Sequence, residues 1–271
     1  MTAREQSTKR DKRRTKSPMP LRTSPRGRRL RIVKINPHGR LTFAGKTGRG
    51  KTGLSRNILH RMARTAEAHR NRTFRIFILA TKPIPPNKEQ DFAAEHFPGT
   101  SYSEFTRLED MAKSTGRVVV WKPQEQEGQR TPEHYAEFFR QVFFLGKPAQ
   151  VFIDELGELT QGLSARRVPR YYHSMYTQGR GLDIGISSGI QDPVFIPREI
   201  LTQADIIHVM QLQGEPDRKK LAASFGKQLL IPVPDKHGVY VVNTEESQIK
   251  YYNDWHRYVD GERENPAPTL L

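Results

Sequence analysis

The sequence predicts an α/β protein whose mostly parallel sheet is covered by helices on both faces. Three observations indicate this fold. Short apolar runs alternate along the chain with segments of helical spacing, the runs are continuous rather than alternately polar, and one run leads straight into a glycine-rich loop. Continuous apolar strands are typical of parallel sheets, because crossover helices bury both faces. A chain of 271 residues is long enough for one large domain of this kind or two small ones.

The expected elements follow in order from residue 30. The run LRIVKI at 30–35 is a strand, and after a turn RLTFA at 40–44 is a second strand that enters the glycine-rich loop. A helix over 52–69 then carries its apolar residues on one face, namely Leu54, Ile58, Met62 and Ala66. Further strands are expected at 74–80, 117–121, 149–155, 182–191, 204–212 and 237–244, the last of which closes the sheet. Further helices are expected at 132–145, 164–178 and 215–225.

Charge separates an N-terminal arm from the rest of the chain. Of the net charge of +16, residues 1–34 contribute +11, from thirteen Lys and Arg against Glu5 and Asp11, which leaves +5 for the remainder. Residues 1–29 have almost no apolar content, so we expect a disordered basic arm there and a globular domain over 30–250. The arm is either a solvated tail that aids solubility or an arm drawn to nucleic acid, and its charge density favours the second.

The expected C-terminal segment, 251–271, begins with a cluster of aromatic side chains. The stretch YYNDWHRY at 251–258 places them at helical spacing. This cluster docks either on the core of its own chain or on a neighbouring subunit, and both alternatives stay open.

Several classes of protein are excluded by what the sequence lacks. It has no cysteine, which rules out disulfides, a thiolate nucleophile and a zinc ribbon and fits a reducing compartment. The nine histidines are scattered without ligand spacing, so no transition metal is assigned. The longest apolar runs, IFILA and VVVW, are far shorter than the roughly 18 residues of a membrane span, and no signal peptide is visible. We therefore expect a soluble intracellular protein.

The stretch AGKTGRGKTGLS at 44–55 fits the P-loop pattern, in which four residues separate Gly45 from Gly50, Lys51 and Thr52. Glycines let the backbone wrap closely around phosphate with its N–H groups turned inward, and the following helix offers its N-terminal dipole to the anion. The lysine of this pattern reaches the β- and γ-phosphates, and the Thr52 hydroxyl holds Mg²⁺. The expected nucleotide-binding residues are Gly45, Lys46, Thr47, Gly48, Arg49, Gly50, Lys51, Thr52 and Gly53.

Two acidic residues end the apolar run VFIDE at 151–155. Asp154 lies where an acid of the Mg²⁺ shell is expected, which makes it the second predicted metal ligand beside Thr52. Glu155 points to the other side, where it can polarise the attacking water as a general base. A second acid beside the metal acid favours hydrolysis over phosphoryl transfer to a small substrate. Glu158 is interpreted as a surface residue.

Three blocks of the sequence together resemble the HerA–FtsK superfamily of DNA-pumping ATPases. GKTGRGKT and VFIDEL are similar to the Walker A and Walker B motifs of that family, although Arg49 stands where a small residue is common. The third block, TQGRGLDIGISSGIQDPVFIPREILTQADIIHVMQL at 177–212, has a G-R pair at a helix end and then a strand that ends in Gln before a Pro-containing loop. The blocks occur in the family order over residues 40–245. The resemblance implies a RecA-like (ASCE) P-loop NTPase fold.

The resemblance also implies roles for two further residues. Gln191 would be the polar sensor on the strand inserted between the P-loop and Walker B strands, where an amide hydrogen-bonds the γ-phosphate and the attacking water. Arg180 would be an arginine finger that stabilises charge across a subunit boundary. Its close rivals for that role are Arg166, Arg167 and Arg170. The predicted catalytic set is therefore Lys51, Glu155, Gln191 and Arg180.

Within the superfamily, the chain most resembles the genome-packaging ATPases of tailless, membrane-containing viruses with double-jelly-roll capsids, because neither an N-terminal β-barrel nor membrane spans fit in its basic arm. This implies ATP-driven translocation of double-stranded DNA into a procapsid by a ring-shaped homo-oligomer, a hexamer or pentamer, with ATP and Mg²⁺ as cofactors. Capsid or portal vertex proteins are implied partners, and the host cytoplasm or the packaging vertex of the virion is the implied location. The alternatives are a plasmid or chromosomal DNA-processing ATPase, and a nucleotide-switched virion assembly protein, which generally brings a membrane segment.

Overall fold

The apolar runs of the sequence pair into one sheet. The computed structural model describes residues 36–69, 71, 73–81, 97–124, 128–145, 147–160, 168–266 and 268, so the predicted arm over 1–29 and the predicted strand over 30–35 lie outside the described residues. The strand order across the sheet is β3-β4-β2-β5-β6-β1-β7-β8-β9. The strands are β1 (Arg40–Ala44), β2 (Arg75–Leu79), β3 (Tyr102–Phe105), β4 (Val118–Trp121), β5 (Ala149–Ile153), β6 (Ile184–Ile190), β7 (Ile206–Val209), β8 (Val239–Asn243) and β9 (Gln248–Tyr252).

Strand direction brings three strand ends together. The seven strands from β3 to β7 in this order are parallel, and β8 and β9 are antiparallel. The register pairs Ala44 of β1 with Ile190 of β6, and Ile153 of β5 with Ser188 of β6. The residues that follow β1, β5 and β6 therefore meet at one edge of the sheet. This arrangement confirms the predicted mostly parallel sheet, and it places β6 between the P-loop strand and the strand that precedes the two acids.

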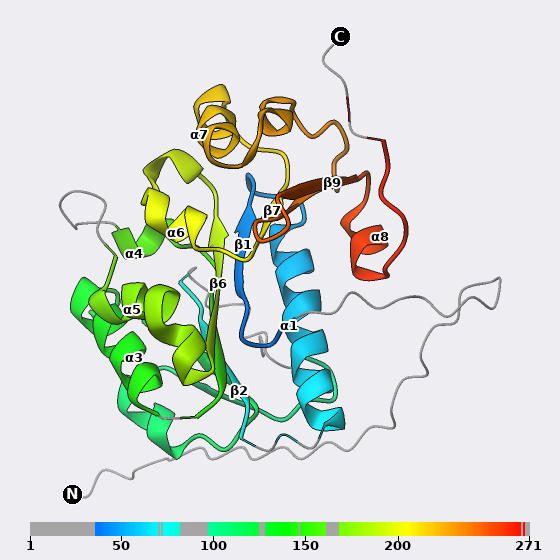
Figure 1. The fold of residues 1–271 in the computed structure, drawn as a ribbon. Coiled ribbons are helices and arrows are strands. Elements are labelled where there is room, and N and C mark those ends of the chain that lie inside the picture. Colours follow the sequence, from blue (N-terminus) through cyan, green and yellow to red (C-terminus); the bar gives the residue numbers. More distant parts are fainter. Residues whose placement is uncertain are drawn as a thin grey trace, which may run out of the picture.

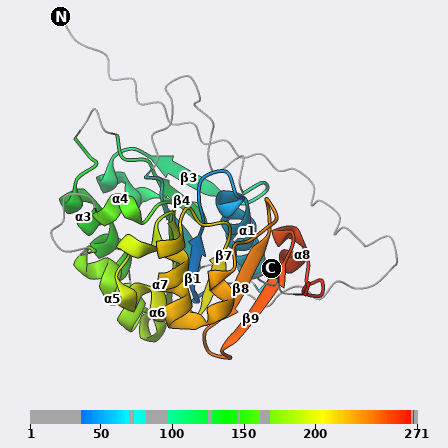
Figure 2. The same cartoon turned by 90° about the horizontal axis from the view of Figure 1, so that it is seen from above.

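Helices cover both faces of the sheet (Figure 1). Helices α1 (Lys51–Ala68) and α8 (Trp255–Val259) lie on one face, and α3 (Pro132–Phe144) and α5 (Arg170–Gln178) lie on the other, as the view from above also shows (Figure 2). Each face has its own cluster of buried apolar residues. The other described helices are α4 (Gly157–Thr160), α6 (Arg198–Thr202) and α7 (Glu215–Phe225), and the 3₁₀ segments are Leu108–Lys113, Gly179–Leu182, Pro193–Phe195 and Lys227–Leu230.

The two edge strands differ from the prediction. β9 lies beyond β8, so the expectation that 237–244 closes the sheet is wrong. Oδ1 of Asn243 accepts hydrogen bonds from the backbone N–H groups of Glu245 and Glu246, each at 3.1 Å, and thereby makes the turn into β9. Exposed polar side chains hide the strand character of β9 in the sequence. At the other edge, β3 is only half-buried along its whole length and carries no apolar run.

The C-terminal aromatic cluster divides between two elements. Tyr251 and Tyr252 belong to β9, whereas Trp255 and Tyr258 belong to α8, and all four side chains are buried in the core of their own chain. The structure thus favours the first of the two docking alternatives. β9 also runs across residue 250, the predicted end of the globular domain.

Helix α5 begins at Arg170, six residues after the predicted start of a helix over 164–178, and residues 161–167 lie outside the described part of the chain. On the face of the sheet that α3 and α5 cover, the core contains the aromatic side chains of these two helices, among them Phe138, Phe139 and Tyr172. Among the described residues, no helix has both the length and the apolar character that crossing a membrane requires.

Candidate active site

The glycine-rich loop connects β1 to α1 and is tied to both neighbouring strands. The N–H of Gly45 donates to the carbonyl oxygen of Ile190 (3.0 Å), and the N–H of Lys46 donates to that of Gln211 (2.9 Å). Gly48 and Gly50 have positive φ angles of 77° and 94°, a left-handed conformation that glycine adopts without steric cost. Backbone of this kind turns successive N–H groups toward one point, which suits an anion.

The first turn of α1 presents the positive end of the helix dipole to the loop. Gly50 is the N-cap residue, no side chain caps the helix, and the first turn has no acidic residue. The free N–H groups and the helix dipole therefore remain available to an anion. A cavity of about 220 Å³ lies here, lined by Lys46, Thr47, Gly48, Gly50, Lys51, Thr52 and Gly53. These features fit a phosphate chain, and the lining residues belong to the predicted nucleotide-binding set.

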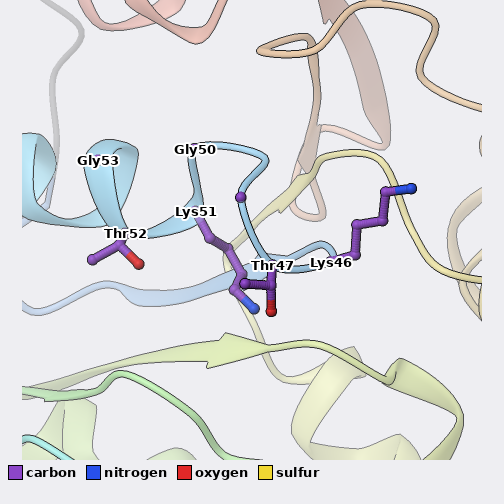
Figure 3. A pocket seen from close by; sticks show the side chains of 7 residues that line it. Lys46, Thr47, Gly50, Lys51, Thr52 and Gly53 are labelled. Atoms are coloured by element: carbon purple, nitrogen blue, oxygen red, sulfur yellow. The ribbon is translucent and has the colours of Figure 1, made fainter. Parts of the chain in front are cut away.

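Lys51 is the buried cation of the site. Its side chain is 6% exposed, and its ammonium donates to the carbonyl oxygens of Gly45 (2.8 Å) and Ile190 (3.4 Å). Oε2 of Glu155 lies 3.5 Å from the same Nζ. Figure 3 shows Lys51 and Thr47 extending to the same side of the loop, whereas Lys46 points away from them.

Asp154 is oriented by the end of a neighbouring strand. Its Oδ1 accepts hydrogen bonds from the backbone N–H (2.8 Å) and the hydroxyl (2.6 Å) of Thr81, which follows β2. Its Oδ2 accepts no hydrogen bond from a described residue, so one carboxylate oxygen stays available at this edge of the sheet. Carboxylate and hydroxyl oxygens are ligands that suit Mg²⁺, so Asp154 and Thr52 fit the metal that the motif implies.

Glu155 and Gln191 meet beside the loop. Oε1 of Glu155 accepts a hydrogen bond from the backbone N–H of Gln191 (3.2 Å), and the side-chain Oε1 of Gln191 accepts one from the hydroxyl of Thr47 (3.2 Å). Glu155 is buried, and its Oε2 accepts no hydrogen bond from a described residue. A carboxylate in contact with both the lysine and the amide can respond to whatever binds between them. The structure therefore brings together three of the four predicted catalytic residues.

Solved structures share this architecture, although no protein-family model and no curated protein matches the sequence. The DNA-packaging ATPase B204 from Sulfolobus Turreted Icosahedral Virus is similar, with a TM-score of 0.61 and 14% identity over 81% of this chain and 99% of that chain. The genome packaging NTPase B204 from Sulfolobus turreted icosahedral virus 2, in complex with ATP-gammaS, gives a TM-score of 0.55 and 13% identity, again over 81% and 99%. The fold is that of a P-loop NTPase.

In this P-loop NTPase fold, Arg180 lies far from the loop of its own chain. It follows α5, and its guanidinium donates to Asp205 (2.6 Å) and Glu245 (2.9 Å). Asp205 also accepts from the backbone N–H of Arg40, at the start of β1, so Arg180 belongs to the opposite edge of the sheet. The five residues of β1 span about 16 Å between the two edges. Arg180 is 55% exposed there, where a neighbouring molecule can reach it.

Of the rival arginines, Arg170 is exposed at the start of α5, with its guanidinium carbon 5.9 Å from the ring centroid of Tyr171. Arg166 and Arg167 lie outside the described residues. The finger role of Arg180 therefore stays a prediction.

Two parts of the P-loop NTPase site were not predicted. Thr81 was missed, although a threonine directly after the apolar run FRIFILA stands at the same strand edge as Asp154. The second part is the contact of α8 with the loop. A Cβ atom on Gly50 would lie 2.7 Å from Nε1 of Trp255, and one on Gly53 would lie 3.1 Å from its Cζ2. No local sequence pattern predicts this contact, because about two hundred residues separate Trp255 from the two glycines.

Proposed function

We propose that this protein is an ATP-driven translocase of double-stranded DNA that packages a viral genome into a procapsid as a ring-shaped homo-oligomer. The observation that carries the proposal is the convergence of Lys51, Glu155 and Gln191 on one glycine-rich loop. A buried lysine alone would suit any phosphate ligand, but the adjoining carboxylate and amide suit hydrolysis in particular.

The residues divide the work as follows. Lys51 and the N–H groups of the loop bind the β- and γ-phosphates, while Thr52 and Asp154 would hold Mg²⁺, which would neutralise charge on those phosphates. Glu155 orients and polarises the attacking water. Gln191 contacts the γ-phosphate through its amide and transmits the loss of that contact to the segment after β6. Thr81 keeps the Asp154 carboxylate in place.

The choice of DNA as the polymer rests on two supports. The similar B204 proteins are described as a DNA-packaging ATPase and a genome packaging NTPase, and the match covers 99% of each of those chains. Residues 1–29 provide a dense basic arm that suits a phosphate backbone. In this role the protein works in the host cytoplasm, at the packaging vertex, next to capsid or portal proteins.

The test is a measurement of ATP turnover per subunit without DNA, with linear double-stranded DNA and with single-stranded DNA. We expect Mg²⁺-dependent hydrolysis that double-stranded DNA stimulates, and a Lys51→Ala preparation made in parallel controls for contaminating ATPases. Hydrolysis that ignores DNA would favour a nucleotide-switched assembly protein. No hydrolysis under any of these conditions contradicts the proposal. Capsid genes beside the gene for this protein would support packaging, whereas plasmid-maintenance genes would support a DNA-processing role.

A further inference from the structure

The C-terminal helix α8 meets the glycine-rich loop through one tryptophan. Trp255 begins α8, its backbone N–H donates to the carbonyl oxygen of His237 (2.9 Å), and its side chain is 7% exposed. Its indole lies so close to Gly50 and Gly53 that a side chain at either position would collide with it or press on it. The imidazole Nδ1 of His237 lies 3.4 Å from the Cβ position of Gly50, so a second ring borders the same turn.

The polar atom of this indole has no hydrogen-bond partner within the described part of the chain. Nε1 of Trp255 donates to no acceptor among the described residues, and it is not one of their fully buried unpartnered atoms, so this donor is open to solvent beside the loop. A buried tryptophan ordinarily satisfies its N–H. Trp121 does so, since its Nε1 donates to the carbonyl oxygen of Thr106 (2.9 Å). The N–H of Trp121 is thus satisfied inside the core, whereas the N–H of Trp255 remains available to a ligand or to water at the loop.

The position of Trp255 matches one end of a nucleoside triphosphate. In a P-loop the lysine reaches the β- and γ-phosphates, while the α-phosphate lies at the first turn of the following helix. The nucleoside joined to that α-phosphate therefore leaves the loop past Gly53, which is exposed to solvent on one side and bordered by Trp255 on the other. The ring of His256 stacks on the indole with a centroid separation of 3.6 Å and extends this surface outward.

We propose that Trp255, with His237 and His256, forms the wall that receives the base and ribose of the nucleotide, and that the Trp255 N–H donates to an oxygen or nitrogen acceptor of that nucleoside. This inference rests on the proposed nucleotide-hydrolysing function and adds to it a second contact region, built from the C-terminal segment. Aromatic surfaces bind purines most strongly because these bases have the largest rings to stack. The favoured ligand is thus a purine nucleoside triphosphate.

The experiment compares ATP with inorganic tripolyphosphate, which lacks the nucleoside. In the unmodified protein, ATP should change the emission of Trp255, whereas tripolyphosphate should bind and leave the emission nearly unchanged. The only other tryptophan, Trp121, is fully buried on β4, four strands away from β1, and does not report on the loop. A Trp121→Phe variant is the matched control, because it makes the same chemical change far from the site.

Affinities for both ligands are then measured in Trp255→Phe and Trp255→Leu. We expect ATP to lose about tenfold in affinity in Trp255→Leu, the size of one lost base–aromatic contact, while tripolyphosphate binds as before. Trp255→Phe should lose less, because it removes only the N–H and part of the ring. If the variants at 255 fail to fold, the exposed His237→Ala and His256→Ala variants and the emission of the unmodified protein decide the question.

The outcomes separate the two claims. If the ratio of ATP affinity to tripolyphosphate affinity is unchanged in all of these variants, Trp255, His237 and His256 do not bind the nucleoside. The proposed ATP hydrolysis is then unaffected. If the unmodified protein binds neither ligand, the proposed function fails, and this inference fails with it.

Discussion

At the scale of single residues, Lys51 can pair with either of two anions, the carboxylate of Glu155 or a bound phosphate chain. Its ammonium now lies between the carbonyl oxygens of Gly45 and Ile190 and the carboxylate of Glu155. A phosphate chain in the loop competes with Glu155 for the same charge. When the ammonium of Lys51 pairs with phosphate instead, the carboxylate of Glu155 can accept a hydrogen bond from water. If Glu155 is the general base, as we propose, nucleotide binding itself makes its carboxylate available.

Lys51→Ala is expected to abolish nucleotide binding, because it removes the buried charge that faces the β- and γ-phosphates. Equilibrium binding of a fluorescent ATP analogue measures this loss. Lys113→Ala is the matched control, since Lys113 is an exposed lysine that pairs with Asp110 (2.9 Å) in the 3₁₀ segment Leu108–Lys113, outside the loop, and it should bind much as the unmodified protein does. Near-normal affinity in Lys51→Ala would remove the phosphate site from this loop.

Glu155→Gln is expected to keep ATP affinity while lowering turnover by roughly 10²-fold or more, the usual effect of losing a general base. The amide retains the size of the carboxylate and can still accept the hydrogen bond from the N–H of Gln191. Turnover and binding are measured on the same preparation. Unchanged turnover would move the base to another residue, with Glu158 the first to examine.

At the scale of elements, the central strands could be predicted and the edges could not. β1, β5 and β6 are continuous apolar runs bounded by turns, so their sequence alone indicates buried parallel strands, and the motifs at their ends follow directly. β3 and β9 are edge strands that face water on one side, so they carry polar as well as apolar residues. They therefore lack the continuous apolar run by which a buried strand is recognised. The contact of Trp255 with Gly50 depends on tertiary packing alone. A pattern in the sequence has no means of showing it.

The packing of β7 against α8 produces a pH-dependent stability. His208 of β7 is fully buried, stacks on Phe43 at a centroid distance of 4.7 Å and lies 5.3 Å from the ring of Tyr258. Burial lowers the pKa of His208 to about 3, even though Nδ1 contacts the carbonyl oxygen of Thr42. The unfolded chain binds a proton near pH 6.5 and the folded chain does not, so protonation favours unfolding.

The free energy of unfolding should therefore have its full value above about pH 6.5. Below that pH it should fall by about 1.4 kcal/mol for each pH unit, until the pH reaches the pKa of His208 in the folded protein. Urea titrations at neutral and mildly acidic pH measure this slope. His208→Phe keeps a flat ring against Phe43 and removes the proton site, so its slope should be shallower. Equal slopes in the two proteins would assign the acid sensitivity to other groups.

At the scale of the whole molecule, the phosphate loop lies at the carboxyl ends of the parallel strands, and Arg180 lies at their amino ends. Gln191 directly follows the carboxyl end of β6, and Arg180 lies in the 3₁₀ turn that precedes its start. A ring of identical subunits is the assembly in which an arginine at one edge reaches the loop of a neighbour at the other. If Arg180 acts across the interface of such a ring, as we propose, its ion pairs with Asp205 and Glu245 are the contacts that hold the guanidinium before the neighbour binds.

Arg180→Ala is accordingly expected to bind ATP and assemble, yet to hydrolyse ATP poorly, since a trans arginine contributes ~10³–10⁵ in rate. Mixing Arg180→Ala with Glu155→Gln supplies the decisive readout. Some interfaces in a mixed ring pair an intact Glu155 with an intact Arg180, so part of the activity should return. If mass measurement confirms mixed rings and no activity returns, Arg180 has no role across the interface, and Arg170 and Arg167 become the candidates.

Displacement of a third strand from a DNA triplex tests directly whether hydrolysis at this loop moves the protein along double-stranded DNA. The triplex is placed at increasing distances from the free end of a linear duplex, and release of the third strand is followed over time. We predict release that requires ATP and Mg²⁺, shows a lag that lengthens with distance, and is absent in Lys51→Ala. ATP hydrolysis with no release at any distance would contradict the account.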